Sequence, residues 1–269
     1  MPLPVLHPCR TVRRRLRPGP RSILLVAVCL AIAAAAVVGL LQAQAHRERP
    51  ALGLFTTLPI YWGEAAQLSD LLAEDREPHW VRRVLEEDYA VRPLDVLDAG
   101  KAGDSLTGLR FLLMAQPRAL SPAENVALDA WVRGGGRLLL FADPMLTEES
   151  SFAIGDKRRP HDVVLLSPIL AHWGLDLQFD EEQEAGIRTA SVFGTELPVE
   201  LHGRLALRPP TGAAGSCRIA TGGLAANCAI GRGRALILAD AALLDAGASD
   251  PETRQAALSA LVEAAFAGN

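Results

Sequence analysis

The feature that most constrains this chain is an uncharged, apolar run of twenty residues, Ser22 to Leu41. A helix rises about 1.5 Å per residue, so this run would span roughly 30 Å, the thickness of the hydrocarbon core of a bilayer. Six arginines and no acidic residue precede the run, whereas the segment after it, His46 to Arg49, carries both signs of charge. The positive-inside rule therefore predicts a cytoplasmic basic tail (1–21), a transmembrane signal anchor (22–41) and an extracytoplasmic domain (46–269).

This topology predicts a single-pass protein of the cell inner membrane, with its N-terminus in the cytoplasm and its main domain periplasmic or extracytoplasmic. The alternative is a cleaved signal peptide, because Ala43, Gln44 and Ala45 form a small-x-small cleavage pattern. The apolar run is longer than the roughly 7–15 residues usual in signal peptides, which favours a retained anchor. Both alternatives export the same domain, and cleavage after Ala45 stays open.

Charge limits the partners of the exported domain. The chain has 27 Lys and Arg against 31 Asp and Glu, and six of the basic residues lie before Ser22, which leaves 21 against 31 in the rest. An acidic surface repels phosphate backbones and anionic headgroups. We therefore expect no nucleic-acid binding, and we expect membrane contact through the one helix.

The exported domain alternates short apolar runs with helical patterns, which predicts an α/β fold with a parallel sheet and helices on both faces. The sequence predicts strands at Leu52–Phe55, Val91–Leu97, Arg110–Ala115, Arg137–Ala142 and Gly231–Asp240, and helices at Glu64–Ala73, His79–Glu87, Ser121–Arg133 and Pro251–Phe266. Alternating residues between Ile187 and Leu207 predict a small antiparallel β section beside this core.

The third of these helices has clear ends. Ser121, Pro122 and Glu124 form a capping-box pattern with proline at the first helical position, and Gly134 to Gly136 predict the stop after Arg133. Because these glycines follow a helix and precede a strand, they do not have the order of a phosphate cradle.

Cys217 and Cys228 are the two cysteines of the exported domain, and they flank a Thr221-Gly222-Gly223 turn signal. If the flanking runs form a hairpin, the two thiols could face each other and form a disulfide in an oxidising compartment. Two buried free thiols are the alternative. The spacing of cysteines and histidines shows no zinc pattern, and we expect no metal and no cofactor.

Several segments resemble one family. The block from Phe111 to Pro144 has a strand ending in a proline loop, a Ser/Pro-Glu helix start, a Gly-Gly turn and a strand ending in Asp-Pro, and it is joined by Ser167–Gly174 and Gly231–Asp240. In this order the motifs resemble the auxiliary extracytoplasmic proteins of gliding-motility-type ABC transporters. The resemblance implies a flavodoxin-like fold similar to class I glutamine amidotransferases, and transporter permease, ATPase or other envelope proteins as partners.

Amidotransferase chemistry needs a cysteine on a tight strand-to-helix elbow, and the sequence lacks one. Neither Cys217 nor Cys228 is followed by a helical pattern, and no Gly-x-Ser-x-Gly is present. We therefore expect no catalytic residue and a protein that is not an enzyme.

Candidate binding residues follow the predicted strands, because ligands of doubly wound sheets collect at the carboxyl ends of strands. These ends carry polar and aromatic side chains, which are Thr56, Thr57, Tyr61, Trp62, Glu64, Gln116, Asp143 and Asp240. The alternative is that Tyr61 and Trp62 cover the sheet edge and that both aspartates cap the following segments. The sequence thus predicts a membrane-anchored, non-catalytic accessory or binding component of an ABC-type transport or surface-assembly system. A cell-envelope hydrolase using Asp143 and Asp240 is the second hypothesis.

Overall fold

The computed structural model describes residues 49–64, 77–98, 105–209, 215–245, 247 and 250–267. The predicted basic tail and the 22–41 anchor lie outside these residues, as does nearly all of the predicted helix Glu64–Ala73. Within the described ranges, no helix combines the length and the apolar composition that a membrane span requires.

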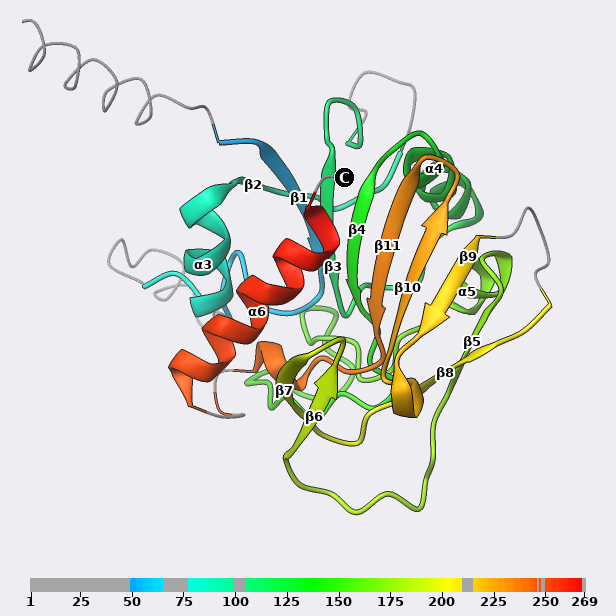
Figure 1. The fold of residues 1–269 in the computed structure, drawn as a ribbon. Coiled ribbons are helices and arrows are strands. Elements are labelled where there is room, and N and C mark those ends of the chain that lie inside the picture. The colour runs from blue at the N-terminus through cyan, green and yellow to red at the C-terminus, as the bar shows by residue number, and fades with distance from the viewer. Residues whose placement is uncertain are drawn as a thin grey trace, which may run out of the picture. The chain divides into compact units, whose positions relative to one another are not determined.

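Seven strands form the main sheet in the order β2-β1-β3-β4-β11-β10-β9 (Figure 1). Their bounds are Ala90–Pro93 (β2), Ala51–Thr56 (β1), Phe111–Ala115 (β3), Arg137–Phe141 (β4), Gly233–Leu238 (β11), Ala225–Ile230 (β10) and Ser216–Ile219 (β9). The first five of these strands are parallel, and β10 and β9 extend the sheet antiparallel. Numbered along the chain, the parallel strands have the flavodoxin-like order 2-1-3-4-5. The predicted parallel α/β sheet is confirmed, and the closer similarity to amidotransferases stays a prediction.

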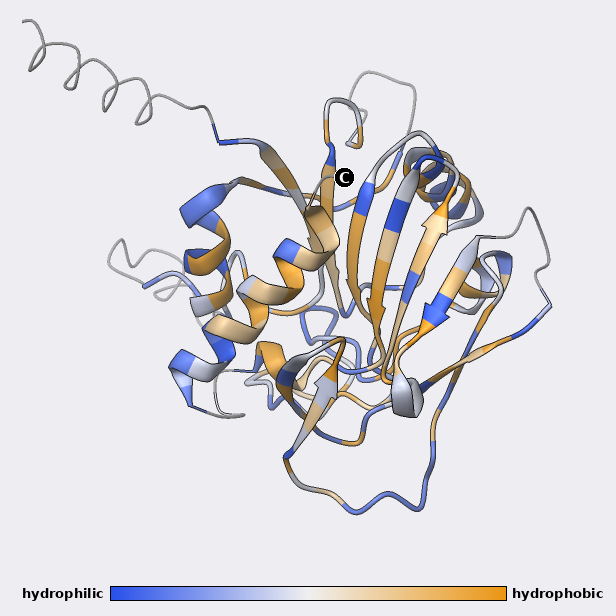
Figure 2. Cartoon of the chain, in the orientation of Figure 1, coloured by the Kyte–Doolittle hydropathy of each residue, from blue (hydrophilic) through white to orange (hydrophobic). Residues whose placement is uncertain are grey.

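Helices cover both faces of this sheet. Trp80–Asp88 (α3) and Pro251–Phe266 (α6) pack on one face, and Pro122–Arg133 (α4) and Ser167–His172 (α5) pack on the other. Neighbouring residues of a central strand enter opposite cores: Leu113 lies in the core with α6, whereas Leu112 lies in the core with α4. Both faces being buried explains why these strands are hydrophobic along most of their length (Figure 2).

The predicted ends of α4 are confirmed. Ser121 Oγ accepts a hydrogen bond from the Glu124 backbone N–H at 3.2 Å, and the Glu124 carboxylate accepts one from the Ser121 N–H at 2.9 Å. The helix stops before Gly134, and Gly135 has a φ of 117°, which glycine adopts without strain.

Two predictions about strands are corrected. Strand β2 ends at Pro93 and not at Leu97, because Leu94 and Leu97 turn into the core under α4. Residues 187–207 also do not form one antiparallel section. Arg188–Val192 (β6) pairs with Thr195–Val199 (β7), whereas Arg204–Leu207 (β8) pairs with Leu175–Gln178 (β5). The reason is packing: Val192 and Leu197 join the α6 core, whereas Leu205 and Leu175 join the α5 core.

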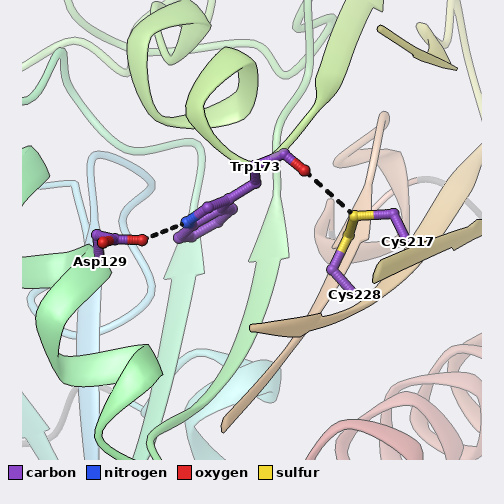
Figure 3. The surroundings of a disulfide bond; sticks show 4 residues. All are labelled: Asp129, Trp173, Cys217 and Cys228. Carbon is purple, nitrogen blue, oxygen red and sulfur yellow. Dashed lines mark hydrogen bonds between the residues drawn. A yellow bond between two sulfur atoms is a disulfide. The ribbon is translucent and has the colours of Figure 1, made fainter. Parts of the chain in front are cut away.

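The hairpin of β9 and β10 contains a disulfide between the directly opposed Cys217 and Cys228, with a Cα–Cα distance of 4.0 Å (Figure 3). The Trp173 carbonyl oxygen lies 3.7 Å from Cys217 Sγ, a contact and not a hydrogen bond, since a disulfide sulfur carries no hydrogen. The Trp173 indole N–H donates to Asp129 Oδ1 at 2.8 Å. Trp173 thus links α4 to the disulfide that joins β9 and β10.

Candidate functional site

A cavity of about 340 Å³ lies at the carboxyl ends of β1 and β2. Its walls come from the end of β1 and the loop after it (56–64), the end of β2 and the two residues after it (93–95), and part of the long loop after β4 (152–160). The first described helix after β1, α3, lies on one face of the sheet, whereas neighbouring β3 leads to α4 on the other. The topological switch point, where doubly wound sheets bind ligands, thus lies between β1 and β3, and the cavity lies next to it, on the β2 side of β1. Its volume is at the low end for ligand pockets.

Aromatic side chains give the cavity its apolar character. The Tyr61 and Trp62 rings meet edge to face with centroids 4.8 Å apart. Arg82 lies 4.2 Å over the Tyr61 ring and donates to the Tyr61 carbonyl at 3.2 Å, which fixes this ring. Trp62 is 73 % exposed. The structure thus presents one held ring and one open ring at the rim.

Glu64 fastens the third wall of the cavity. Its carboxylate accepts hydrogen bonds from the Ser150 hydroxyl at 2.5 Å, the Ser151 N–H at 2.7 Å and the Ser151 hydroxyl at 2.6 Å. Burial alone would raise the pKa of Glu64, but these hydrogen bonds outweigh it and the pKa is lowered. Glu64 therefore lines the cavity mainly as a clamp on the loop after β4.

The two threonines at the end of β1 shape the cavity floor. Thr56 Oγ1 accepts from the Leu58 N–H at 2.9 Å, and the Thr57 hydroxyl donates to the Gln116 carbonyl at 2.5 Å. Thr57 Oγ1 also accepts from the His161 N–H at 3.3 Å. Both side chains border the cavity while holding the turn that follows β1.

Gln116 lies behind the cavity and does not line it. Its side chain is fully buried, donates to the Asp143 carbonyl at 3.0 Å and the His161 carbonyl at 2.8 Å, and accepts from the Asp143 N–H at 3.0 Å. Its φ of 43° is unusual for a residue other than glycine. Gln116 thus cross-links the ends of β3 and β4 to the long loop.

Asp143 and Asp240 are each 1 % exposed and do not border the cavity. The Asp143 carboxylate accepts from the Met145 N–H at 2.8 Å and the Ala241 N–H at 3.0 Å, and the Asp240 carboxylate accepts from the Ala242 N–H at 2.8 Å and the Glu200 N–H at 3.0 Å. Burial raises the pKa of Asp143 to about 6, and burial together with the charge of Asp143 raises the pKa of Asp240 well above its usual value. The geometry assigns both side chains to backbone capping, and a ligand contact from either stays a prediction.

Sequence reasoning missed part of the wall. Asp95, after β2, borders the cavity, as do Phe152 and Arg158, whose guanidinium lies 4.2 Å over the Phe152 ring. The strand-end rule would have found Asp95 had β2 been ended at Pro93. Phe152 and Arg158 carry no such signal, because they lie in a loop without regular structure.

The described residues contain no group of three or more His, Cys, Asp or Glu side chains that could hold a metal ion. The cavity instead combines aromatic rings with hydroxyl and charged groups at its border. Such a lining suits recognition of a ligand or partner segment that has both an apolar and a polar side.

Similar solved structures include the exo-β-1,4-mannosidase Op5Man5 from Opitutaceae bacterium strain TAV5, at 13 % identity and a TM-score of 0.46 over 85 % of this chain and 38 % of that one. A β-galactosidase from Rahnella sp. R3 has 12 % identity and a TM-score of 0.45, over 81 % of this chain and 31 % of that one. The cytoplasmic protein STM3548 from Salmonella typhimurium has 11 % identity and a TM-score of 0.44, over 79 % of this chain and 97 % of that one. The chain spans less than two fifths of the two glycosidases, and at these TM-scores the similarities carry no argument about activity.

No curated protein matches the sequence. Residues 37–193, more than half of the chain, match the family described as an ABC-type uncharacterized transport system. This match agrees with the resemblance carried by the strand and turn motifs of residues 111–144, and the chain belongs to this ABC-type transport auxiliary family.

Proposed function

We propose that this protein is a membrane-anchored, non-catalytic accessory component of an ABC-type transport or surface-assembly system. Its α/β domain lies on the extracytoplasmic side and binds a partner or cargo at the cavity beside β1 and β2. Membership of the transport family supports the assignment to an ABC-type transport system, and the uncharged run Ser22 to Leu41 supports the membrane anchor.

The observation that carries the binding role is the contrast within the cavity rim. Tyr61 is held by Arg82 and Glu64 is held by two serines, whereas the Trp62 ring is 73 % exposed beside them. Exposed aromatic rings next to a cavity are typical anchors of recognition sites, which commonly contribute 2 kcal/mol or more, about thirtyfold in affinity.

The test is co-purification from solubilised membranes. Trp62→Ala should reduce recovery of the transporter permease and ATPase, whereas Val126→Ala, a similarly exposed apolar side chain on α4, should leave recovery unchanged. Equal recovery with both variants would contradict the proposal.

The hydrolase hypothesis has less support, because both carboxylates of Asp143 and Asp240 already accept backbone hydrogen bonds and are buried. A folded Asp143→Asn protein that kept its partners but lost a measurable hydrolytic activity would restore that hypothesis.

Topology has its own test. A reporter that works only outside the cytoplasm should be active when fused after Asn269 and inactive when fused before Ser22. The reverse result would overturn the proposed orientation.

A further inference from the structure

Strand β6 has an edge without a partner. It pairs with β7 from Arg188↔Val199 to Val192↔Thr195 and joins no other strand (Figure 1). Among the described residues, no hydrogen bond from outside this hairpin reaches the backbone of Thr189 or Ser191. An open strand edge of this kind is a template for pairing with another chain. Strand β6 contains no lysine or proline, and its one charged side chain, Arg188, lies at its first position.

The turn determines which backbone groups face this edge. Phe193 and Gly194 have φ values of 49° and 91°, as in a two-residue type I′ turn, which makes Val192 and Thr195 a hydrogen-bonded pair. Because such pairs alternate along an antiparallel ladder, Ala190 also directs its N–H and C=O groups toward β7. Thr189 and Ser191 therefore direct theirs to the open edge.

Two exposed apolar side chains flank the open edge symmetrically. Ile187 and Phe193 are 48 % and 47 % exposed, and each lies three residues from Ala190. Phe193 occupies a turn position with positive φ, where asparagine or glycine would be the unstrained choice. A bulky exposed ring kept in a disfavoured conformation points to a role in contact.

We propose that β6 pairs antiparallel with β6 of a second copy of this chain, in the register centred on Ala190. A two-fold interface requires that residue i opposes j while j opposes i. In this register Thr189 opposes Ser191 of the second copy, so the free N–H and C=O groups of both copies meet. Just beyond the two ends of this ladder, Ile187 of each copy lies beside the turn residue Phe193 of the other, which brings the exposed apolar side chains together.

Charge and size agree with this register. The domain is acidic overall, but the segment from Ile187 to Thr195 has no acidic residue, so two copies can approach here without opposed carboxylates. Arg188 opposes the apolar Val192 of the second copy, and the small Ala190 lies on the two-fold axis. The two Ala190 Cα atoms form a non-hydrogen-bonded pair about 4.5 Å apart.

Cysteine cross-linking distinguishes this register from others. In full-length protein with Cys9→Ser and Cys29→Ser, which keeps the Cys217–Cys228 disulfide, Ala190→Cys should give a covalent dimer on oxidation. Thr189→Cys alone should not, because its Cα atom lies about 8 Å from its own equivalent, beyond the roughly 7 Å limit for a disulfide. A mixture of Thr189→Cys and Ser191→Cys chains should cross-link, since these positions oppose each other.

Non-covalent association gives a second measurement that does not depend on a cysteine. Thr189→Pro removes an outward N–H without removing a bond to β7. Because each copy loses one donor, the dimer loses two backbone hydrogen bonds, which should weaken dimerisation at least about tenfold. Ala190→Ser, which keeps the register and cannot cross-link, should remain dimeric. A purified wild-type protein that stays monomeric at its highest soluble concentration would overturn the proposal. So would equal cross-linking of Ala190→Cys and Thr189→Cys, which would show contact without this register.

Discussion

At the ends of β1 and β2, aromatic and polar side chains surround a cavity, whereas at the ends of β4 and β11 the polar side chains are buried in backbone hydrogen bonds. Trp62 is 73 % exposed and Asp143 is 1 % exposed, although both follow a parallel strand at the same edge of one sheet. The difference arises from the connections. The chain after β11 turns directly into the short helix Ala242–Leu244 (η2), and the N–H groups at the start of this helix need acceptors. The loop after β1 instead borders a cavity.

The comparison teaches that a polar residue after a strand is not by itself a binding residue. Where the following backbone has unpaired N–H groups, a carboxylate satisfies them first, because a buried unpaired donor costs about 1–3 kcal/mol. Only polar side chains that are not needed as acceptors for backbone N–H groups remain available for a ligand.

The largest expected effect is on stability and comes from Asp143→Ala. At pH 4–5, where folded Asp143 keeps its proton, this change leaves the buried N–H of Ala241 and the partly buried N–H of Met145 without acceptors and should lower the free energy of unfolding by about 2–5 kcal/mol. Asp95→Ala is the matched control at the cavity, because Asp95 is exposed and its hydrogen bond to Arg118 uses the backbone carbonyl. Urea denaturation of both variants measures the difference, and equal losses would break the comparison.

The second expected effect is a pH dependence. Folding raises the pKa of Asp143 from 3.8 to about 6, so between these values the folded state keeps a proton that the unfolded state releases. The free energy of unfolding therefore falls as pH rises through this window, by about 3 kcal/mol for this group. Asp143→Asn cannot titrate, so its stability relative to wild type should increase by up to that amount between pH 4 and pH 7.

The comparison with this variant is needed because other groups titrate in the same window. Burial raises the pKa of Glu148 to about 7, with the same sign, and burial lowers the pKa of His79 to about 4, with the opposite sign. Both groups are present in wild type and variant and cancel in the difference. Asp240 does not cancel, because the charge of Asp143 helps to raise its pKa, and losing that charge stabilises the variant at high pH with the same sign as the loss of Asp143 titration. A difference that does not change with pH would show that Asp143 is ionised throughout.

Much of the fold could be predicted from sequence because its signals are local. The Ser121–Glu124 capping box, the glycine stop after Arg133 and the period of α6 each depend on neighbouring residues, and each is confirmed. The pairing of β8 with β5 could not be predicted, because the alternating pattern of 187–207 does not say which distant strand completes each ladder.

The candidate site was predictable to a similar limit. The strand-end rule found the cavity residues Thr56, Tyr61 and Trp62, because they lie at the end of β1 or in the loop that follows it. It could not separate them from Asp143, because the burial of a side chain after a strand depends on whether the following segments fold back over it, as those of Met145 and Ala241 do over Asp143. The contribution of Phe152 depends on the hydrogen bonds of Glu64 to the distant Ser150 and Ser151, which no local pattern encodes.

A smaller effect is expected at the clamp on the long loop. Glu64→Gln keeps one acceptor but loses charge-assisted hydrogen bonds to Ser150 and Ser151, and it should cost about 1 kcal/mol. Amide hydrogen exchange should become faster in residues 150–160 and stay unchanged in α4. Unchanged exchange in the loop would mean that Glu64 does not hold this wall, and the cavity would then depend on Thr57 and Gln116.

The smallest expected effect separates the two aromatic residues of the rim. Trp62→Ala should change the free energy of unfolding by no more than about 0.5 kcal/mol, since surface substitutions away from buried features have effects of this size. Tyr61→Ala should cost more, about 1–2 kcal/mol, because Tyr61 packs against the α6 core and carries Arg82 over its ring. Thermal and urea unfolding of the two variants measure the order. If Trp62→Ala were the more destabilising, this ring would be covering the sheet edge and not serving as an open anchor, and the distinction between the two ends of the sheet would not hold.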